Sequence, residues 1–190
     1  MWEPAVGPVL VAYRPHLAPG VTALDPVCAE GVEEACDAID QDCDGRIDEG
    51  CEGCTDAPFV AALAWNGSAD LDLVFEFATS TTAATTADMD RLRSGIAYSA
   101  PEGQRVERLA LRELVEATYR VGVAYRGSCG DDASDAGSCG DEQPVTVSLS
   151  LSVNGAVHGP FNRTLMRGET ADLVWVAVGT CVTRDCMPPE

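Results

Sequence analysis

A run of carboxylates at alternate positions, residues 40–49, is the part of the sequence best suited to chemistry. Aspartates occupy its first, third and fifth positions, glycine the sixth and an apolar residue the eighth. Carboxylates with this spacing converge when the chain curls around a hard cation, and the glycine allows the sharp turn. The run predicts a metal site with these ligands: Asp40, Asp42, Asp44, the Arg46 carbonyl, and Asp48 or Glu49.

The ligand types favour Ca²⁺ over copper. All the candidate ligand atoms are oxygens, which suit calcium, whereas copper prefers imidazole or soft ligands and no histidine is near in sequence. The twelfth position, where an EF-hand has a bidentate glutamate, is Cys51, so the loop is closer to the shorter calcium loops of thrombospondin type 3 repeats. The alternative is an acidic turn without metal that disulfides alone hold.

The nine cysteines indicate disulfides rather than structural zinc. Only Cys51 and Cys54 have the spacing of a zinc pair, and both histidines lie far from them in sequence. We expect Cys129 to pair with Cys139 and Cys181 with Cys186, while most cysteines in residues 28–54 pair among themselves with a connectivity that the sequence leaves open. An odd cysteine remains, free or bonded to another chain.

The segment around the aspartates resembles a known motif. Residues 28–54, and above all the run from Cys36 to Cys51, are similar to the metal-binding motif of MopE-type proteins, which recurs in secreted and surface proteins of myxobacteria and related bacteria. The resemblance implies metal binding outside the cytoplasm. The copper function of that motif does not carry over, because this loop offers carboxylates and no nearby histidine.

Composition excludes several classes of partner. A net charge of −19 disfavours nucleic acid and anionic membranes, which attract clustered basic residues. No segment reaches the roughly 20 apolar residues of a membrane helix. The first residues lack the basic and apolar regions of a signal peptide, so we expect an exported protein to have lost its signal already.

Apolar and polar residues alternate in several segments after Pro58. A period of two indicates half-buried antiparallel strands with an apolar inner face. Asn154 and Gly155 separate two such segments and are typical of a tight hairpin turn. Strands are expected at residues 61–65, 70–77, 119–125, 145–153, 156–158, 161–166 and 171–178.

Residues 105–117 are compatible with a helix or a strand. Val106, Leu109 and Ala110 have helical spacing, but Leu109 and Leu111 also alternate. Because no capping residue precedes the segment and its neighbours are strands, we expect a strand at residues 108–111. Six to eight short strands with turns between them predict a β-sandwich.

Composition divides the chain into four parts. Residues 1–26 carry five prolines and predict an extended arm with one short strand at residues 9–13. Residues 27–56 hold eleven acidic residues and five cysteines against one arginine, so metal and disulfides must hold this block. Residues 57–183 should form the sandwich and residues 184–190 a tail. The expected fold is all-β: an antiparallel β-sandwich preceded by an extended arm and a small disulfide-rich acidic metal loop.

A second resemblance covers residues 58–180. The Asp-Leu-Asp-Leu run at residues 70–73 and the strand around Tyr119 are similar to a bacterial extracellular β-sandwich family, although Glu116 and Ala117 replace its Pro-Gly turn. The resemblance implies a binding or structural module. Four aspartates could form a second cation site: Asp70, Asp72, Asp88 and Asp90. The simpler interpretation is that they occupy outward-facing positions of a strand and a loop.

These patterns favour a non-enzymatic protein. We expect a secreted or cell-surface structural or adhesive protein with a calcium loop.

The short strand in the arm either folds back onto its own sandwich or adds to a neighbouring copy, which would build a head-to-tail homopolymeric fibre. The alternative is a carbohydrate- or protein-binding module, which a row of exposed tryptophans would favour, although alternation predicts Trp175 to be buried. A hydrolase would need histidines or carboxylates converging in a cleft, and the sequence carries no hydrolase motif.

Overall fold

A computed structural model describes most of the chain, in the segments 9–12, 14–25, 27–51, 57–67, 69–78, 93–98, 104–127 and 143–181. Within these residues the secondary structure consists of eleven β-strands. The expectations for Cys54, for the Cys129–Cys139 and Cys181–Cys186 pairs, and for the tail after residue 183 involve residues outside the described segments.

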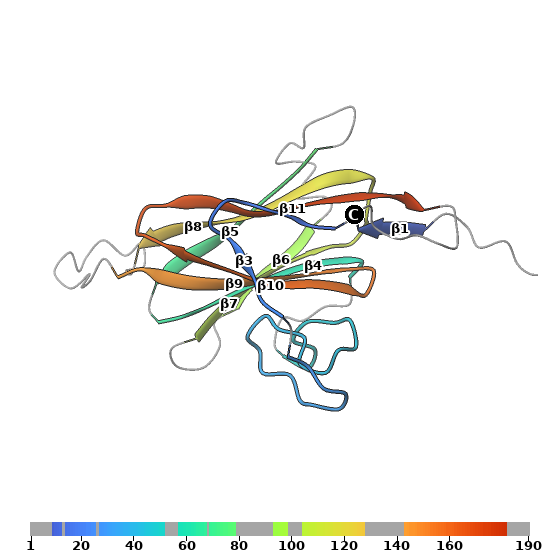
Figure 1. The fold of residues 1–190 in the computed structure, drawn as a ribbon, viewed down its shortest axis with the longest axis horizontal. Helices are drawn as coiled ribbons and strands as arrows, with labels where there is room; N and C mark the ends of the chain where they lie inside the picture. Colours follow the sequence, from blue (N-terminus) through green and yellow to red (C-terminus); the bar gives the residue numbers. More distant parts are fainter. Residues whose placement is uncertain are drawn as a thin grey trace, which may run out of the picture.

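The strands form two antiparallel sheets that pack face to face as a sandwich (Figure 1). In the five-stranded sheet the order is β1 (Val9–Ala12), β11 (Thr170–Cys181), β8 (Ala117–Gly127) and β5 (Asp70–Ala78), with β2 (His16–Leu17) also paired to β11. In the six-stranded sheet the order is β3 (Thr22–Ala23), β10 (Ala156–Leu165), β9 (Val145–Val153), β4 (Phe59–Asn66), β7 (Gln104–Leu111) and β6 (Arg93–Tyr98). The expected all-β sandwich is confirmed.

The alternating strands turn their apolar residues into one core between the sheets. Tyr119 of β8 lies at its centre, with its ring centroid 5.1 Å from that of Phe59 and 5.8 Å from that of Phe77. Its hydroxyl donates to the Val115 carbonyl oxygen at 2.8 Å, so the buried polar atom is satisfied. The apolar surface buried between the sheets stabilises the fold.

The hairpin predicted at Asn154 and Gly155 joins β9 to β10, and both residues have positive φ, as such a turn requires. β10 is one strand where two were expected, and its register shifts between His158 and Phe161. The ambiguous segment is a strand, β7, longer than predicted because it pairs along the whole of β4. β6 was not predicted, since its residues do not alternate.

Trp175 is half-buried, not buried as alternation predicted. The register between β8 and β11 shifts between Asp172 and Val174, and both Leu173 and Val174 are buried as a result. The shift reverses the alternation, so Trp175 leaves the core and lies against His16 of β2, with ring centroids 6.0 Å apart.

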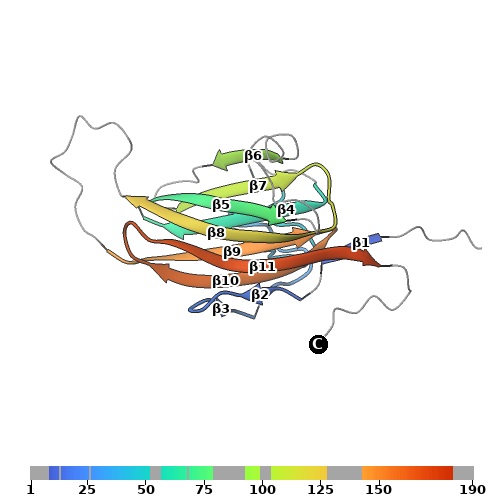
Figure 2. The same ribbon diagram turned by 90° about the horizontal axis from the view of Figure 1, so that it is seen from above.

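The N-terminal arm is more structured than predicted, with β1, β2 and β3 in place of one strand. β1 pairs with β11 of its own chain, where Val9 lies opposite Cys181 and Ala12 opposite Val178. β2 pairs with β11 and β3 with β10, so the arm contacts both sheets (Figure 2). Strands of two residues are too short to show an alternation of apolar and polar residues. They form because they pair with longer strands of the sandwich.

The acidic block lies on the outer face of the six-stranded sheet (Figure 1). Ala38 and Ile47 of the block are buried against Ala62 and Ala64 of β4 and Val106 of β7. Both faces of β4 are consequently covered, and every residue from Phe59 to Trp65 is buried. The small alanines on this face leave room for the block.

Candidate metal centre

Two disulfides hold the acidic block: Cys28–Cys43 and Cys36–Cys51. Each spans 15 residues in sequence, with Cα atoms 5.6 and 5.7 Å apart, respectively. The two loops that they close overlap in sequence. A disulfide that closes a loop of this length lowers the conformational entropy of the unfolded chain, which stabilises the folded state by about 3 kcal/mol. The expectation that these cysteines pair among themselves is confirmed for the four described, and the structure supplies the connectivity.

Side chain to backbone hydrogen bonds curl the aspartate run. Asp42 Oδ1 accepts the Asp44 N–H at 3.0 Å, and Asp44 Oδ1 accepts the Arg46 N–H at 2.8 Å. Asp40 Oδ2 accepts the Gly45 N–H at 3.2 Å, across the turn that the positive φ of Gly45 allows. The curl brings one carboxylate oxygen from each of Asp40, Asp42 and Asp44 within 4.8 Å of the others.

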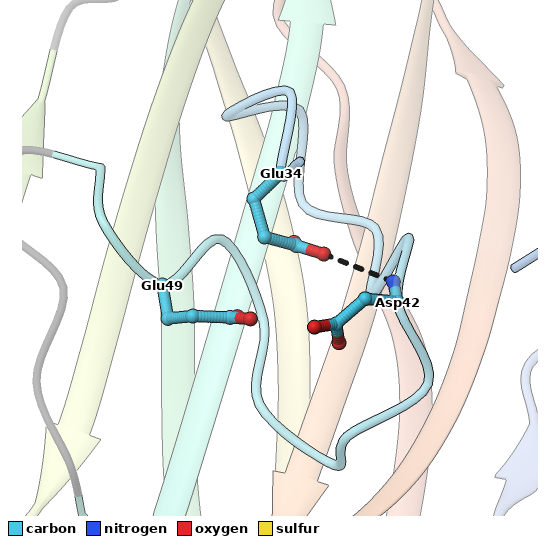
Figure 3. A group of neighbouring side chains, drawn as sticks. All are labelled: Glu34, Asp42 and Glu49. Carbon is cyan, nitrogen blue, oxygen red and sulfur yellow. Dashed lines mark hydrogen bonds between the residues drawn. The ribbon is translucent and has the colours of Figure 1, made fainter. Parts of the chain in front are cut away.

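A second group of carboxylates meets the first at Asp42. Glu34 and Glu49 face Asp42 from two sides, and one oxygen from each of the three lies within 4.8 Å of the others (Figure 3). Glu34 also organises the block, because Oε1 accepts the N–H groups of Gln41 and Asp42 at 2.7 and 3.2 Å and Oε2 accepts that of Asp48 at 2.9 Å. Sequence reasoning missed Glu34, because it lies outside the alternating run.

Asp48 has a different role from the other aspartates. It is fully buried, and its two oxygens accept the Ala38 N–H at 2.9 and 3.1 Å. The carboxylate also forms a buried ion pair with Arg108 of β7. The structure therefore places Asp48 between the block and the sandwich, and among the described residues it belongs to neither group of converging carboxylates.

Arg46 is exposed, and its guanidinium lies 3.9 Å from the Asp44 carboxylate. The Arg46 side chain thus points toward solvent beside the aspartates. The use of its carbonyl as a ligand stays a prediction.

The environment of these carboxylates disfavours their charged forms. Burial raises the pKa of Glu34, Asp40 and Glu49, and the neighbouring carboxylates raise the pKa of Asp40 and Glu49 further. Asp40 Oδ1 and Glu49 Oε2 are buried and lack a hydrogen-bond partner. A bound cation would relieve both the repulsion and the missing contacts.

The block is fixed to the sandwich next to these carboxylates. Ser152 Oγ of β9 donates to the Gly45 carbonyl oxygen at 2.8 Å. Gly45 packs so closely on the hairpin that a Cβ there would overlap the Gly155 carbonyl oxygen. The aspartate loop therefore rests on the β9–β10 hairpin.

The second cation site that the sequence suggests involves residues outside the described segments, Asp88 and Asp90. Asp70 and Asp72 lie on β5, half-buried, near Glu107 of β7. Burial raises the pKa of Glu107, whose carboxylate accepts the Leu73 N–H. Within the described part of the chain, these three carboxylates are not among the groups close enough to share an ion.

Comparisons with known proteins give no relative. No family model, no curated protein and no solved structure matches the chain. The described residues also contain no helix long and apolar enough to cross a membrane.

Proposed function

We propose that the chain is a secreted or cell-surface structural protein of bacterial type whose acidic block holds one structural Ca²⁺ ion. The observation that carries the proposal is the convergence of Asp40, Asp42 and Asp44, with a buried oxygen of Asp40 that lacks a partner. Six to eight oxygen ligands suit Ca²⁺. Asp48 is held by Arg108, so Glu49 is the better candidate to complete the site together with the Arg46 carbonyl.

The proposed location follows from the disulfides. Two disulfides in the acidic block are typical of an oxidising compartment. The resemblance of residues 28–54 to the MopE-type motif supports export and attachment at a bacterial surface.

A structural role is favoured over catalysis and over carbohydrate binding. The two histidines lie on different sheets, His16 on β2 and His158 on β10, so they do not form a common site. Of the two tryptophans that the structure describes, Trp65 is buried and donates to the Ala69 carbonyl oxygen, while Trp175 is half-buried. These two do not form the exposed aromatic row that a sugar-binding surface would offer.

Assembly into a fibre stays a prediction. β1 occupies the edge of β11 in its own chain, so a head-to-tail polymer would require β1 to be exchanged between copies.

Isothermal titration of chelator-treated protein tests calcium binding. We expect one Ca²⁺ per chain with a dissociation constant of about 10⁻⁴ to 10⁻³ M, the range of extracellular modules. Asp40→Asn, which keeps an acceptor for the Gly45 N–H, should abolish the heat of binding. Asp72→Asn, a half-buried carboxylate on β5, is the matched control and should bind as the wild type does. Absence of Ca²⁺ binding by the wild-type protein would contradict the proposal.

A further inference from the structure

A cavity lies between part of the acidic block and the outer face of the six-stranded sheet. Its volume is about 260 Å³. The block contributes Asp40, Asp44 and Gly45 to its wall, and the sandwich contributes Ser150, Gly159 and Pro160. The cavity therefore lies directly between the proposed calcium ligands and strands β9 and β10.

Two residues of this cavity wall each carry a buried polar atom that lacks a hydrogen-bond partner. One is Oδ1 of Asp40, a residue only 7% exposed, and the other is Oγ of Ser150, a residue 1% exposed. One comes from the block and one from the sandwich. Buried polar atoms are nearly always satisfied, and a ligand or an ordered water in the cavity could supply the missing contact to both residues.

The absence of a side chain at Gly159 leaves room for the buried Ser150 hydroxyl. Gly159 lies beside it on β10, and a Cβ at Gly159 would come within 3.2 Å of Ser150 Oγ and 2.8 Å of the Leu149 carbonyl oxygen. The hydroxyl does not join the block by a direct hydrogen bond, unlike Ser152, whose Oγ donates to the Gly45 carbonyl oxygen.

We propose that Ser150 completes the cation site from the sandwich side. Its hydroxyl supplies an oxygen to the ion that Asp40 binds, directly or through one ordered water. This inference rests on the proposed calcium function and adds the sandwich to the ligand set. Calcium accepts hydroxyl and water oxygens as well as carboxylates. The ion then ties the acidic block to β9, so calcium binding and docking of the block stabilise each other.

Ser150→Ala tests the proposal by titration and by urea unfolding with and without Ca²⁺. Ca²⁺ should bind about tenfold more weakly, as when an outer contact of a metal site is removed. In chelator, the urea midpoint should match that of the wild type, because the hydroxyl has no protein partner to lose. The urea shift that Ca²⁺ causes at a fixed concentration should shrink accordingly.

Two serines of the same strand are matched controls. Ser148→Ala changes a half-buried serine of β9 outside the cavity wall and should alter neither measurement. Ser152→Ala removes the hydrogen bond to Gly45 and should lower the urea midpoint in chelator as well.

The possible failures are distinguishable. If the wild type binds Ca²⁺ and Ser150→Ala binds it equally well, the cavity holds only water and the inference is overturned, while the calcium proposal stands. A lower midpoint in chelator with unchanged affinity would make Ser150 merely structural and would also overturn it. If the wild type binds no Ca²⁺, the proposed function itself fails.

Discussion

At the scale of single residues, the acidic loop depends on glycine at position 45 for two reasons. Its φ is +94°, a backbone conformation that is sterically unfavourable for any residue with a Cβ. Its Cα also faces the Gly155 carbonyl oxygen so closely that a methyl group would overlap it. The sixth position of the motif therefore serves both the turn and the docking of the loop.

We expect Gly45→Ala to lower the free energy of unfolding by about 2–3 kcal/mol, because backbone strain and steric overlap act together. Gly31→Ala is the matched control, since Gly31 also has a positive φ, +79°, but has nothing within 4 Å of an added Cβ. It should cost only about 1 kcal/mol. Urea unfolding of both variants measures the difference, and equal losses would show that the contact with the hairpin is unimportant.

At the scale of elements, one buried ion pair joins the acidic block to the sandwich. The Arg108 side chain of β7 and that of Asp48 are only 4% and 0% exposed. Burial raises the pKa of Asp48, although the charge and hydrogen bond of Arg108 act in the opposite direction. Glu34 accepts the Asp48 N–H and faces Asp42, so it links the docking contact to a proposed calcium ligand.

Removing one partner of this pair should be costly. We expect Arg108→Met to lower the free energy of unfolding by about 3–5 kcal/mol, because it leaves a buried carboxylate without its charge partner. Asp48→Asn in the same chain should recover part of that loss, which a double-mutant cycle measures. Arg120→Met, which removes more exposed ion pairs with Glu76 and Asp172, should cost less than about 1 kcal/mol. Strict additivity of the Arg108 and Asp48 substitutions would argue against a direct interaction.

At the scale of the whole molecule, the N-terminal arm decides which sheet edges are open. β1 covers β11 from Val178 to Cys181, and β3 covers β10 at Phe161 and Asn162. An uncovered strand edge presents unpaired N–H and C=O groups that invite pairing with another chain. The arm therefore acts as an edge cover, and the same contact would join copies if β1 were exchanged.

We expect a chain lacking residues 1–13 to self-associate, because the end of β11 then loses its partner. Sedimentation velocity over a range of concentrations measures this, with the full-length chain as the comparison. Adding a peptide of residues 1–13 in excess should reverse the self-association that the truncation causes. A truncated chain that stays monomeric throughout would show that the β11 edge does not attract a strand.

The sequence by itself determined the fold class and most of the strands. In strands such as β5 and β9, apolar and polar residues alternate, and this pattern can be seen within the strand's own sequence. It predicts a strand with one buried face and one exposed face. The Asn154–Gly155 turn and the glycine of the aspartate run are equally local, because each depends on a φ that few residues adopt. The convergence of Asp40, Asp42 and Asp44 follows from their spacing along one curled segment.

Only the tertiary structure decided the rest. Glu34 lies beside Asp42 and Glu49, Asp48 pairs with Arg108, and Ser150 lines the cavity. These placements depend on how the acidic block folds and docks on a sheet whose residues are far away in sequence. The register shift in β11 turned Trp175 out of the core, and β2 and β3 exist only through their partners. Long-range contacts of this kind leave no periodic trace in the residues that make them, so no local pattern could have revealed them.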